Sequence, residues 1–365
     1  MDEFIYSQPV KIYFGPGKLS QLSDILAELK IESAVIACGR HFLPQAQALM
    51  DKIPQIKGCF GAVEPNPQLS GAEETAALAK SVDADAVIGI GGGSSIDTAK
   101  FAGAIALGDK SALAYYRGEE PFPEKRLKII AIPTTAGTGS EVTQVSVMSN
   151  ITEKRTINNP VFMPVAAIVD PSLTLSVPPK TTMNTGLDAM AHALEGYWSK
   201  NHQPISDLMA IEAVRIILEN LEKVYDNGSD IDARSRMAYA SLLGGLSFAL
   251  PKTAASHACS YPLSEDYHLP HGEACAFTLD SLVKINNSDR LEYLAKRVGL
   301  TCSDELSDRI HALKSKAGLK MVLEDLGDVD LEKLCCDCAA HGLMNNNPVK
   351  LGQEQLRDMF LNLKK

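Results

Sequence analysis

The residue pattern of this chain changes near its middle, and the change limits the folds that it can adopt. In the first half, short β-branched runs alternate with longer amphipathic stretches, which predicts a parallel sheet covered by helices. The predicted strands are residues 33–38, 86–90, 128–132 and 166–169, and the predicted helices are 21–30, 72–81 and 96–107. In the second half, strand signals fade and helical patterns fill residues 205–224, 233–248 and 291–298.

The boundary between the two patterns falls at Val177-Pro178-Pro179. Two consecutive prolines break a preceding element, and Thr181-Thr182 is suited to start the next helix. We therefore predict an α/β, Rossmann-like N-terminal domain with a parallel sheet over residues 1–178. An all-α C-terminal domain is predicted over residues 179–365.

Composition excludes several classes of protein. The chain has 365 residues, of which 45% are apolar and 22% are charged, enough for the cores of two globular domains. Its 35 basic and 45 acidic residues give a net charge of -10, which repels nucleic acids and anionic membranes. We expect no nucleic-acid partner and no membrane partner.

The N-terminus and the cysteines favour a cytoplasmic location. The chain opens with two acidic residues in MDEFIYSQPVKIYFG, whereas a secretory signal has a basic start and a long apolar segment. No apolar run approaches the roughly 20 residues that span a bilayer. The eight cysteines are expected to be reduced thiols, and the group Cys335, Cys336 and Cys338 is interpreted as buried thiols on a helix.

A glycine turn links the strand at 86–90 to the helix that follows. Gly91, Gly92 and Gly93 allow a tight turn that brings backbone N–H groups close to a ligand. Ser94 or Ser95 is placed to cap a helix whose N-terminus attracts phosphate, and a dinucleotide pyrophosphate suits such a site. A purely structural turn explains the same residues, since the spacing is not the usual G-x-G-x-x-G.

A second loop, residues 132–143, also follows a strand and is rich in threonine, serine and glycine. Its hydroxyls and amides suit the phosphates and ribose of a nucleotide. They also suit a loop that satisfies its own backbone, so this alternative stays open.

The helical half holds a candidate metal site. Asp188 and His192 are four residues apart and therefore share one helix face, and His257 and His271 follow later. One carboxylate and three imidazoles suit Fe²⁺ or Zn²⁺ and leave room for a substrate oxygen. The alternative is that these are core residues, as we expect for the other four histidines, which lie at the surface or pack: His41, His202, His311 and His341.

Several motifs taken in order resemble the iron-containing, or group III, alcohol dehydrogenases. They are Phe14-Gly-Pro-Gly-Lys-Leu, Asn66-Pro67, the 91–100 and 133–143 segments, Ile168-Val-Asp-Pro, Gly186-Leu-Asp-Ala-Met-Ala-His-Ala-Leu-Glu, Pro270-His-Gly and Asn347-Pro348. The resemblance covers nearly the whole chain. It implies the dehydroquinate synthase-like fold of that family, a homodimer or larger homo-oligomer, and hydride transfer between NAD(P)H and a small aldehyde or primary alcohol.

The resemblance also implies the roles of individual residues. The metal ligands would be Asp188, His192, His257 and His271, holding one divalent ion, Fe²⁺ or Zn²⁺. The pyrophosphate would lie on Gly92, Gly93 and Ser94. The rest of the dinucleotide site would be lined by Asn66, Thr134, Thr135, Thr143, Lys154 and Leu173.

The chain departs from the family pattern in two places. Many members have a second histidine four residues after the third ligand, where this chain has Tyr261. Tyr261 is a candidate for proton transfer, with packing as the alternative.

NAD-preferring members often carry an aspartate after the strand at 33–38, where this chain has Gly39-Arg40. An arginine there pairs with a 2′-phosphate, so NADP(H) is expected over NAD(H).

Several other functions would share part of this residue pattern. A glycerol-1-phosphate dehydrogenase or a dehydroquinate synthase-like enzyme would share the glycine turn and the metal, and a maleylacetate-reductase-like enzyme would lack the metal. A non-catalytic interaction protein on the same scaffold would be expected to have lost a ligand. The region around His257 resembles relatives that reduce short anionic aldehydes, such as phosphonoacetaldehyde.

Overall fold

A computed structural model describes residues 3–150 and 153–364. The chain forms two compact units. The α/β unit comprises Ser7–Thr135 and Ser140–Thr174, and the helical unit comprises the residues up to Tyr6, Ala136–Gly139 and Leu175–Lys365. A parallel α/β unit and a helical unit were both predicted, and this fold class is confirmed.

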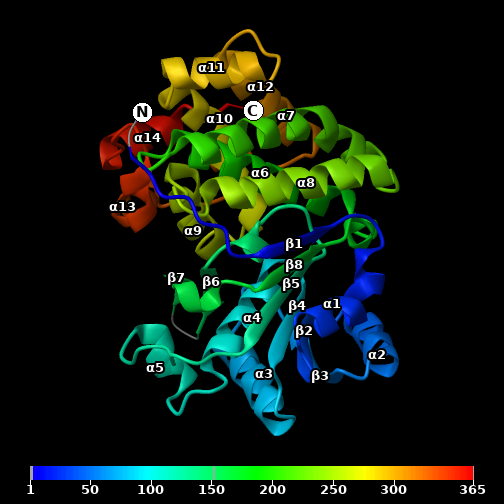
Figure 1. The fold of residues 1–365 in the computed structure, drawn as a ribbon. Helices are drawn as coiled ribbons and strands as arrows, with labels where there is room; N and C mark the ends of the chain where they lie inside the picture. The colour runs from blue at the N-terminus through cyan, green and yellow to red at the C-terminus, as the bar shows by residue number, and fades with distance from the viewer. Residues whose placement is uncertain (1–2, 151–152, 365) are drawn as a thin grey trace. The chain divides into compact units, whose positions relative to one another are not determined.

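The α/β unit is built on a six-stranded parallel sheet (Figure 1). Its strand order is β1-β8-β5-β4-β2-β3. The strands are β1 Lys11–Phe14, β2 Ala34–Gly39, β3 Ile56–Val63, β4 Ala86–Gly91, β5 Lys128–Pro133 and β8 Ala166–Val169. The four predicted strands are present. The two that the sequence analysis missed, β1 and β3, are the edge strands, where one-sided pairing weakens the apolar signal.

Helices cover both faces of this sheet because its strands are apolar on both sides. In β2, Val35 and Ala37 pack on one face, in the same cluster as α3 and α4, whereas Ile36 and Cys38 pack on the other with α1 and α2. The helices are α1 Leu22–Glu28, α2 Leu43–Lys52, α3 Leu69–Ser81, α4 Gly93–Ile105 and α5 Ala112–Arg117. A two-stranded antiparallel ribbon, β6 Val145–Ser149 and β7 Lys154–Asn158, completes the unit.

The helical unit packs around α6 Pro179–Trp198, which is buried along most of its length. Three helices contact α6 closely, namely α7 Pro204–Asp226, α8 Ile231–Phe248 and α10 His271–Ile285 (Figure 1). The remaining helices are α9 Ala255–Glu265, α11 Asp289–Arg297, α12 Ser303–Lys316, α13 Leu331–Ala340 and α14 Gln353–Leu361. One apolar core joins these helices and holds Cys335 and Cys338, whereas Cys336 is exposed.

The start of α6 differs from the sequence prediction. The helix begins at Pro179 rather than at Thr181-Thr182. Proline is well suited to the first helical turn, because its fixed φ is helical and the N–H that it lacks has no partner there. The two prolines therefore open the helix instead of standing outside it.

Candidate metal centre and glycine turn

Three imidazoles and a carboxylate from separate stretches of the helical unit converge on one point. Asp188 and His192 lie on α6, one turn apart, while His257 lies on α9 and His271 begins α10. Asp188 Oδ1 is 3.7 Å from His257 Nε2, 3.7 Å from His271 Nε2 and 4.0 Å from His192 Nδ1. The structure thus brings together all four residues that were predicted as metal ligands.

Hydrogen bonds fix how two of these imidazoles present their nitrogens. His192 Nδ1 lies 3.2 Å from the backbone oxygen of Gly137, and His257 Nδ1 is hydrogen-bonded to Glu195 Oε2. Because both partners are acceptors, each Nδ1 carries a proton, and each Nε2 is the nitrogen that faces the centre. The two Nε2 atoms nevertheless lie 3.0 Å apart. Two ring nitrogens at that distance need a proton or a metal ion between them.

One oxygen of the carboxylate in this cluster lacks a hydrogen-bond donor. Asp188 Oδ1 is buried and accepts no hydrogen bond from any residue within 3–150 and 153–364. A buried acceptor without a donor is costly, and metal coordination relieves that cost. The observed donors therefore fit a divalent ion such as Fe²⁺ or Zn²⁺.

The protonation states of Asp188 and His192 suit metal binding at neutral pH. For His257, burial by itself lowers the pKa, but Cys275 and Glu195 outweigh burial and raise it well above its ordinary value, so a metal ion would have to displace a proton there. Burial by itself raises the pKa of the Asp188 carboxyl, but His192, His271 and His257 outweigh burial and leave this pKa below its ordinary value. Burial lowers the pKa of His192 to about 4. Asp188 is therefore a carboxylate and His192 a neutral imidazole, which are the forms that bind metals.

Two further residues of the cluster were not predicted. Glu195 is fully buried, and its Oε1 accepts hydrogen bonds from Ser256 N at 2.6 Å and His257 N at 3.3 Å. Cys275 contributes a thiol, and the ligand atoms of Asp188, His257, His271 and Cys275 all lie within 4.8 Å of one another. The spacing of four residues between His271 and Cys275 on one helix was the signal that would have found the thiol.

Tyr261 lies on α9, four residues after His257. Its ring stacks on that of His341, with ring centroids 4.3 Å apart. This contact gives Tyr261 a packing partner within the helical unit. The candidate role of Tyr261 in proton transfer stays a prediction.

In the α/β unit, the glycine turn joins β4 directly to α4. Gly91 has a φ of 152°, and an added Cβ there would lie 2.4 Å from Ser95 Oγ, so this position requires glycine. The N-cap of α4 is Gly92 and the helix begins at Gly93. The expectation that Ser94 or Ser95 forms the cap was wrong, because both serines lie inside the first turn. A cap without a side chain leaves the N-terminal amides of α4 accessible to an anion.

The second predicted loop is tied to this turn by hydrogen bonds. Thr134 N donates to Gly91 O at 2.9 Å, and the hydroxyl of Thr135 lies beside Gly92. Thr143 Oγ1 is 3.3 Å from the buried Lys100 Nζ, which also donates to Ser140 Oγ at 2.7 Å. The structure therefore places Thr134 and Thr135 at the glycine turn and connects Thr143 to the helix that follows it.

The other predicted cofactor residues have contacts of their own in the α/β unit. Lys154 Nζ donates to Asn66 Oδ1 at 2.9 Å, so these two contact each other. Gly39 ends β2, and the exposed Arg40 extends its Nη2 to within 3.7 Å of Glu64 Oε1. Leu173, in a short 3₁₀ helix, packs against the core behind the sheet.

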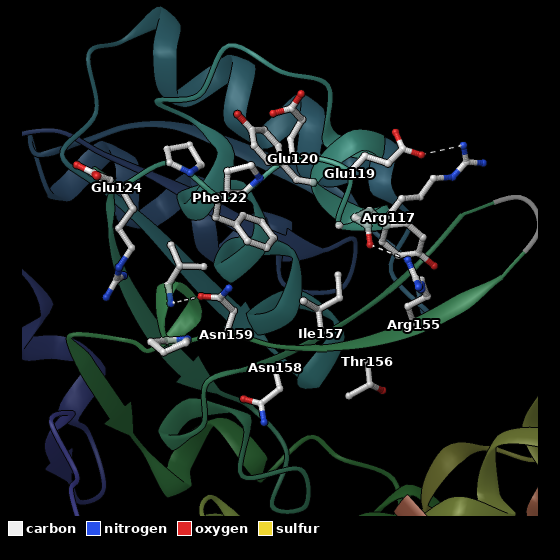
Figure 2. Close-up of a pocket in the computed structure, with 18 residues that line it drawn as sticks. Arg117, Glu119, Glu120, Phe122, Glu124, Arg155, Thr156, Ile157, Asn158 and Asn159 are labelled. Atoms are coloured by element: carbon white, nitrogen blue, oxygen red, sulfur yellow. Dashed lines mark hydrogen bonds and ion pairs between the residues drawn. The ribbon is translucent and has the colours of Figure 1, made fainter. Parts of the chain in front are cut away.

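A separate cavity of about 970 Å³ lies in the α/β unit beside α5 and β7 (Figure 2). Its walls carry three arginines and three glutamates: Arg117, Arg126, Arg155, Glu119, Glu120 and Glu124. Arg117 and Glu119 form an ion pair at 3.7 Å, and Arg155 Nη1 donates to Tyr116 O at 3.1 Å. The formal charges of these six residues balance, and none of the predicted site residues lines the cavity.

Together, a parallel α/β unit with a glycine turn and a helical unit with a histidine–carboxylate cluster are the architecture of a metal-dependent dehydrogenase. Family comparison agrees with this class. Residues 9–171 match the model of the iron-containing alcohol dehydrogenases, and residues 182–363 match the C-terminal model of the Fe-containing alcohol dehydrogenase family. The chain belongs to the iron-containing alcohol dehydrogenase family and is an oxidoreductase of that type.

The similar proteins include reductases and dehydrogenases, as their names state. The structure of sulfoacetaldehyde reductase from Bifidobacterium kashiwanohense in complex with NAD+ superposes with a TM-score of 0.95 and 38% identity, covering 100% of this chain and 99% of that one. The 1,3-propanediol dehydrogenase of Citrobacter freundii is 31% identical, with 98% of each protein covered. Long-chain-alcohol dehydrogenase 1 of Geobacillus thermodenitrificans is 41% identical, but the match spans 69% of this chain and only 61% of that protein.

The length and apolar character of the helices bear on membrane insertion. In the part of the chain that the structure describes, none is long and apolar enough to cross a membrane.

Proposed function

We propose that this protein transfers a hydride between NAD(P)H and a short aldehyde, with one divalent ion held by Asp188, His192, His257 and His271. The observation that carries this proposal is the approach of the His192 and His257 Nε2 atoms to 3.0 Å, beside the unpartnered Asp188 Oδ1. A divalent ion bound there supplies Lewis-acid polarisation of the substrate oxygen.

The residues around the centre hold it in one arrangement. Glu195 and the Gly137 oxygen keep the Nδ1 protons of His257 and His192 pointing away from the centre, so that both Nε2 atoms bind without rearrangement. The His271 side chain is 42% exposed, whereas that of Asp188 is 3% exposed. Substrate oxygen would therefore reach the centre from the His271 side.

The cofactor is proposed to bind on the glycine turn, with its pyrophosphate at Gly92, Gly93 and Ser94. Asn66, Thr134, Thr135, Thr143, Lys154 and Leu173 would line the rest of its site. We propose a preference for NADP(H), which the exposed guanidinium of Arg40 at the end of β2 supports. Replacing Arg40 by Ala would then raise KM for NADPH and leave KM for NADH unchanged, whereas equal effects on both would contradict the preference.

For the substrate, we propose a short aldehyde with an anionic group, such as a sulfonate or phosphonate. The 38% identity to a sulfoacetaldehyde reductase over the whole chain supports this class. We further propose a homodimer or larger homo-oligomer in the cytoplasm.

The test is a screen of cofactor oxidation with metal analysis of the same preparation. Sulfoacetaldehyde and phosphonoacetaldehyde would be compared with acetaldehyde and propionaldehyde, each with NADPH and with NADH. We expect one bound divalent ion, reduction of the anionic aldehydes at higher kcat/KM, and loss of activity in chelator. Activity unaffected by complete metal removal would overturn the mechanism, and equal turnover of the neutral aldehydes would overturn only the substrate class.

A further inference from the structure

A cysteine lies inside the proposed metal centre, in addition to the histidines and the carboxylate. Cys275 follows His271 by one turn of α10, so the two side chains share a face of this helix. Its Sγ lies 3.7 Å from His271 Nε2, and it belongs to the set of four ligand atoms within 4.8 Å of one another.

Three of the spacings in this set are close to those around a single ion. Donor atoms on one tetrahedral zinc are about 3.3 to 3.6 Å apart, given Zn–N and Zn–S bonds of roughly 2.0 to 2.3 Å. Cys275 Sγ lies 3.7 Å from His271 Nε2. Asp188 Oδ1 lies 3.7 Å from His257 Nε2 and 3.7 Å from His271 Nε2. A contraction of these distances onto a common ion would bring Sγ to bonding distance beside His271 Nε2, as a fifth donor next to the four ligands of the proposed function.

The protein also holds the thiol firmly in place. Cys275 is fully buried, and its backbone oxygen accepts a hydrogen bond of 2.7 Å from Ser256 Oγ, on the residue that precedes His257. This bond ties α10 to α9 at the level of the cluster. Cys275 is therefore a buried member of the cluster, next to the more exposed His271.

We propose that Cys275 is a direct sulfur ligand of the ion in the substrate-free protein, and that it biases the centre toward Zn²⁺ over Fe²⁺. The proposal depends on the metal site of the proposed function. Ligation breaks the Sγ–H bond, forms a bond between Sγ and the ion, and releases the proton to solvent. A thiolate is a soft donor that zinc accepts readily beside imidazole and carboxylate, and it adds a negative charge that an oxygen- and nitrogen-only site lacks.

Cobalt substitution tests this ligand directly, without reliance on activity. The whole protein is freed of metal, loaded with Co²⁺ alone, and its absorption spectrum recorded. A thiolate ligand produces a charge-transfer band in the near ultraviolet, whereas the visible bands report bound Co²⁺ whatever the ligands are. We expect the ultraviolet band in the wild type and its loss in Cys275→Ser and Cys275→Ala.

The matched control is Cys335→Ser, which changes another buried thiol of the helical unit outside the cluster and should keep the band. Visible Co²⁺ bands in the Cys275 variants show that they fold and still bind the ion. A wild type that binds Co²⁺ without the ultraviolet band, or a Cys275→Ser variant that retains it, overturns the sulfur ligand alone. Failure of the wild type to bind Co²⁺ overturns the proposed metal centre as well.

Competition between metals tests the selectivity. Metal-free protein is equilibrated with equal concentrations of Zn²⁺ and Fe²⁺ without oxygen, and the bound metals are measured. We expect the bound zinc-to-iron ratio to fall in Cys275→Ser relative to wild type and Cys335→Ser. An unchanged ratio overturns the proposed bias toward zinc.

Discussion

The Nε2 atoms of His192 and His257 lie 3.0 Å apart, while the Nδ1 atom of each ring is engaged by an acceptor. The backbone of Gly137 and the carboxylate of Glu195 thus decide what the two rings present to each other. In the metal-free protein a proton between the two Nε2 atoms makes this approach favourable, and a bound ion would take its place.

Removal of one imidazole should release the ion. His271→Ala is expected to lose its metal on gel filtration in chelator and to lose activity by more than the roughly 10- to 100-fold that follows removal of an outer-shell partner. NADPH binding, followed by fluorescence, should persist, because the glycine turn belongs to the other unit. His311→Ala is the control, since His311 pairs with Asp280 at 2.9 Å outside the cluster. Full activity in His271→Ala would contradict the ligand assignment.

Glu195 should raise metal affinity by positioning His257. Glu195→Gln keeps the size of the side chain but removes the charge that holds the Nδ1 proton, so metal affinity is expected to fall by roughly 10- to 100-fold. Competition with a chromogenic chelator measures this affinity. Glu273→Gln is a matched control, because Glu273 is equally buried in the helical unit and its Oε1 accepts from Lys320 N at 2.9 Å. Equal affinities in the two variants would refute the positioning role of Glu195.

The glycine turn should not tolerate a side chain at Gly91. Gly91 has a φ of 152°, and a Cβ added there would clash with Ser95 Oγ. Gly91→Ala is therefore predicted to lower the free energy of unfolding by about 1–3 kcal/mol and to weaken cofactor binding. Urea unfolding and cofactor titration provide the two measurements. Gly342→Ala serves as the control, since an added methyl there meets no atom within 4 Å among the described residues. A Gly91→Ala variant as stable as this control would show that the turn is not constrained.

The buried Lys100 should make stability depend on pH in the alkaline range. Burial lowers its pKa to about 8, although Asp97 and Glu141 oppose the shift, while an unfolded lysine titrates near 10.4. Between these values the unfolded chain binds more protons than the folded one, so stability gains up to about 1.4 kcal/mol per pH unit as pH rises from about 8 to about 10.

Lys100→Met should lack this contribution. The difference in unfolding free energy between wild type and variant, measured in urea at several pH values, is expected to move in favour of the wild type across that range. Parallel pH profiles for the two proteins would show that Lys100 does not titrate there. Lys128→Met is a control, because Lys128 donates to backbone oxygens at the surface-facing start of β5.

The local elements of this protein could be read from its sequence. The four central strands and the amphipathic helices have apolar periods that depend on neighbouring residues only, and the glycine run at 91–93 requires a turn wherever it occurs. Asp188 and His192 share a face because one helix spaces them by a turn. The motifs at His257 and His271 were recognised through their resemblance to a family, not through any local rule.

Tertiary structure alone decided how these pieces combine. His257 and His271 reach Asp188 because α9 and α10 pack beside α6, and helix packing depends on the fit of side chains far apart in the chain. The proton positions depend on Gly137 and Glu195, and the thiol of Cys275 joins the centre because α10 turns that face inward. Sequence spacing fixes which residues share a helix face, whereas the neighbours of that face are set by long-range packing, which no local pattern encodes.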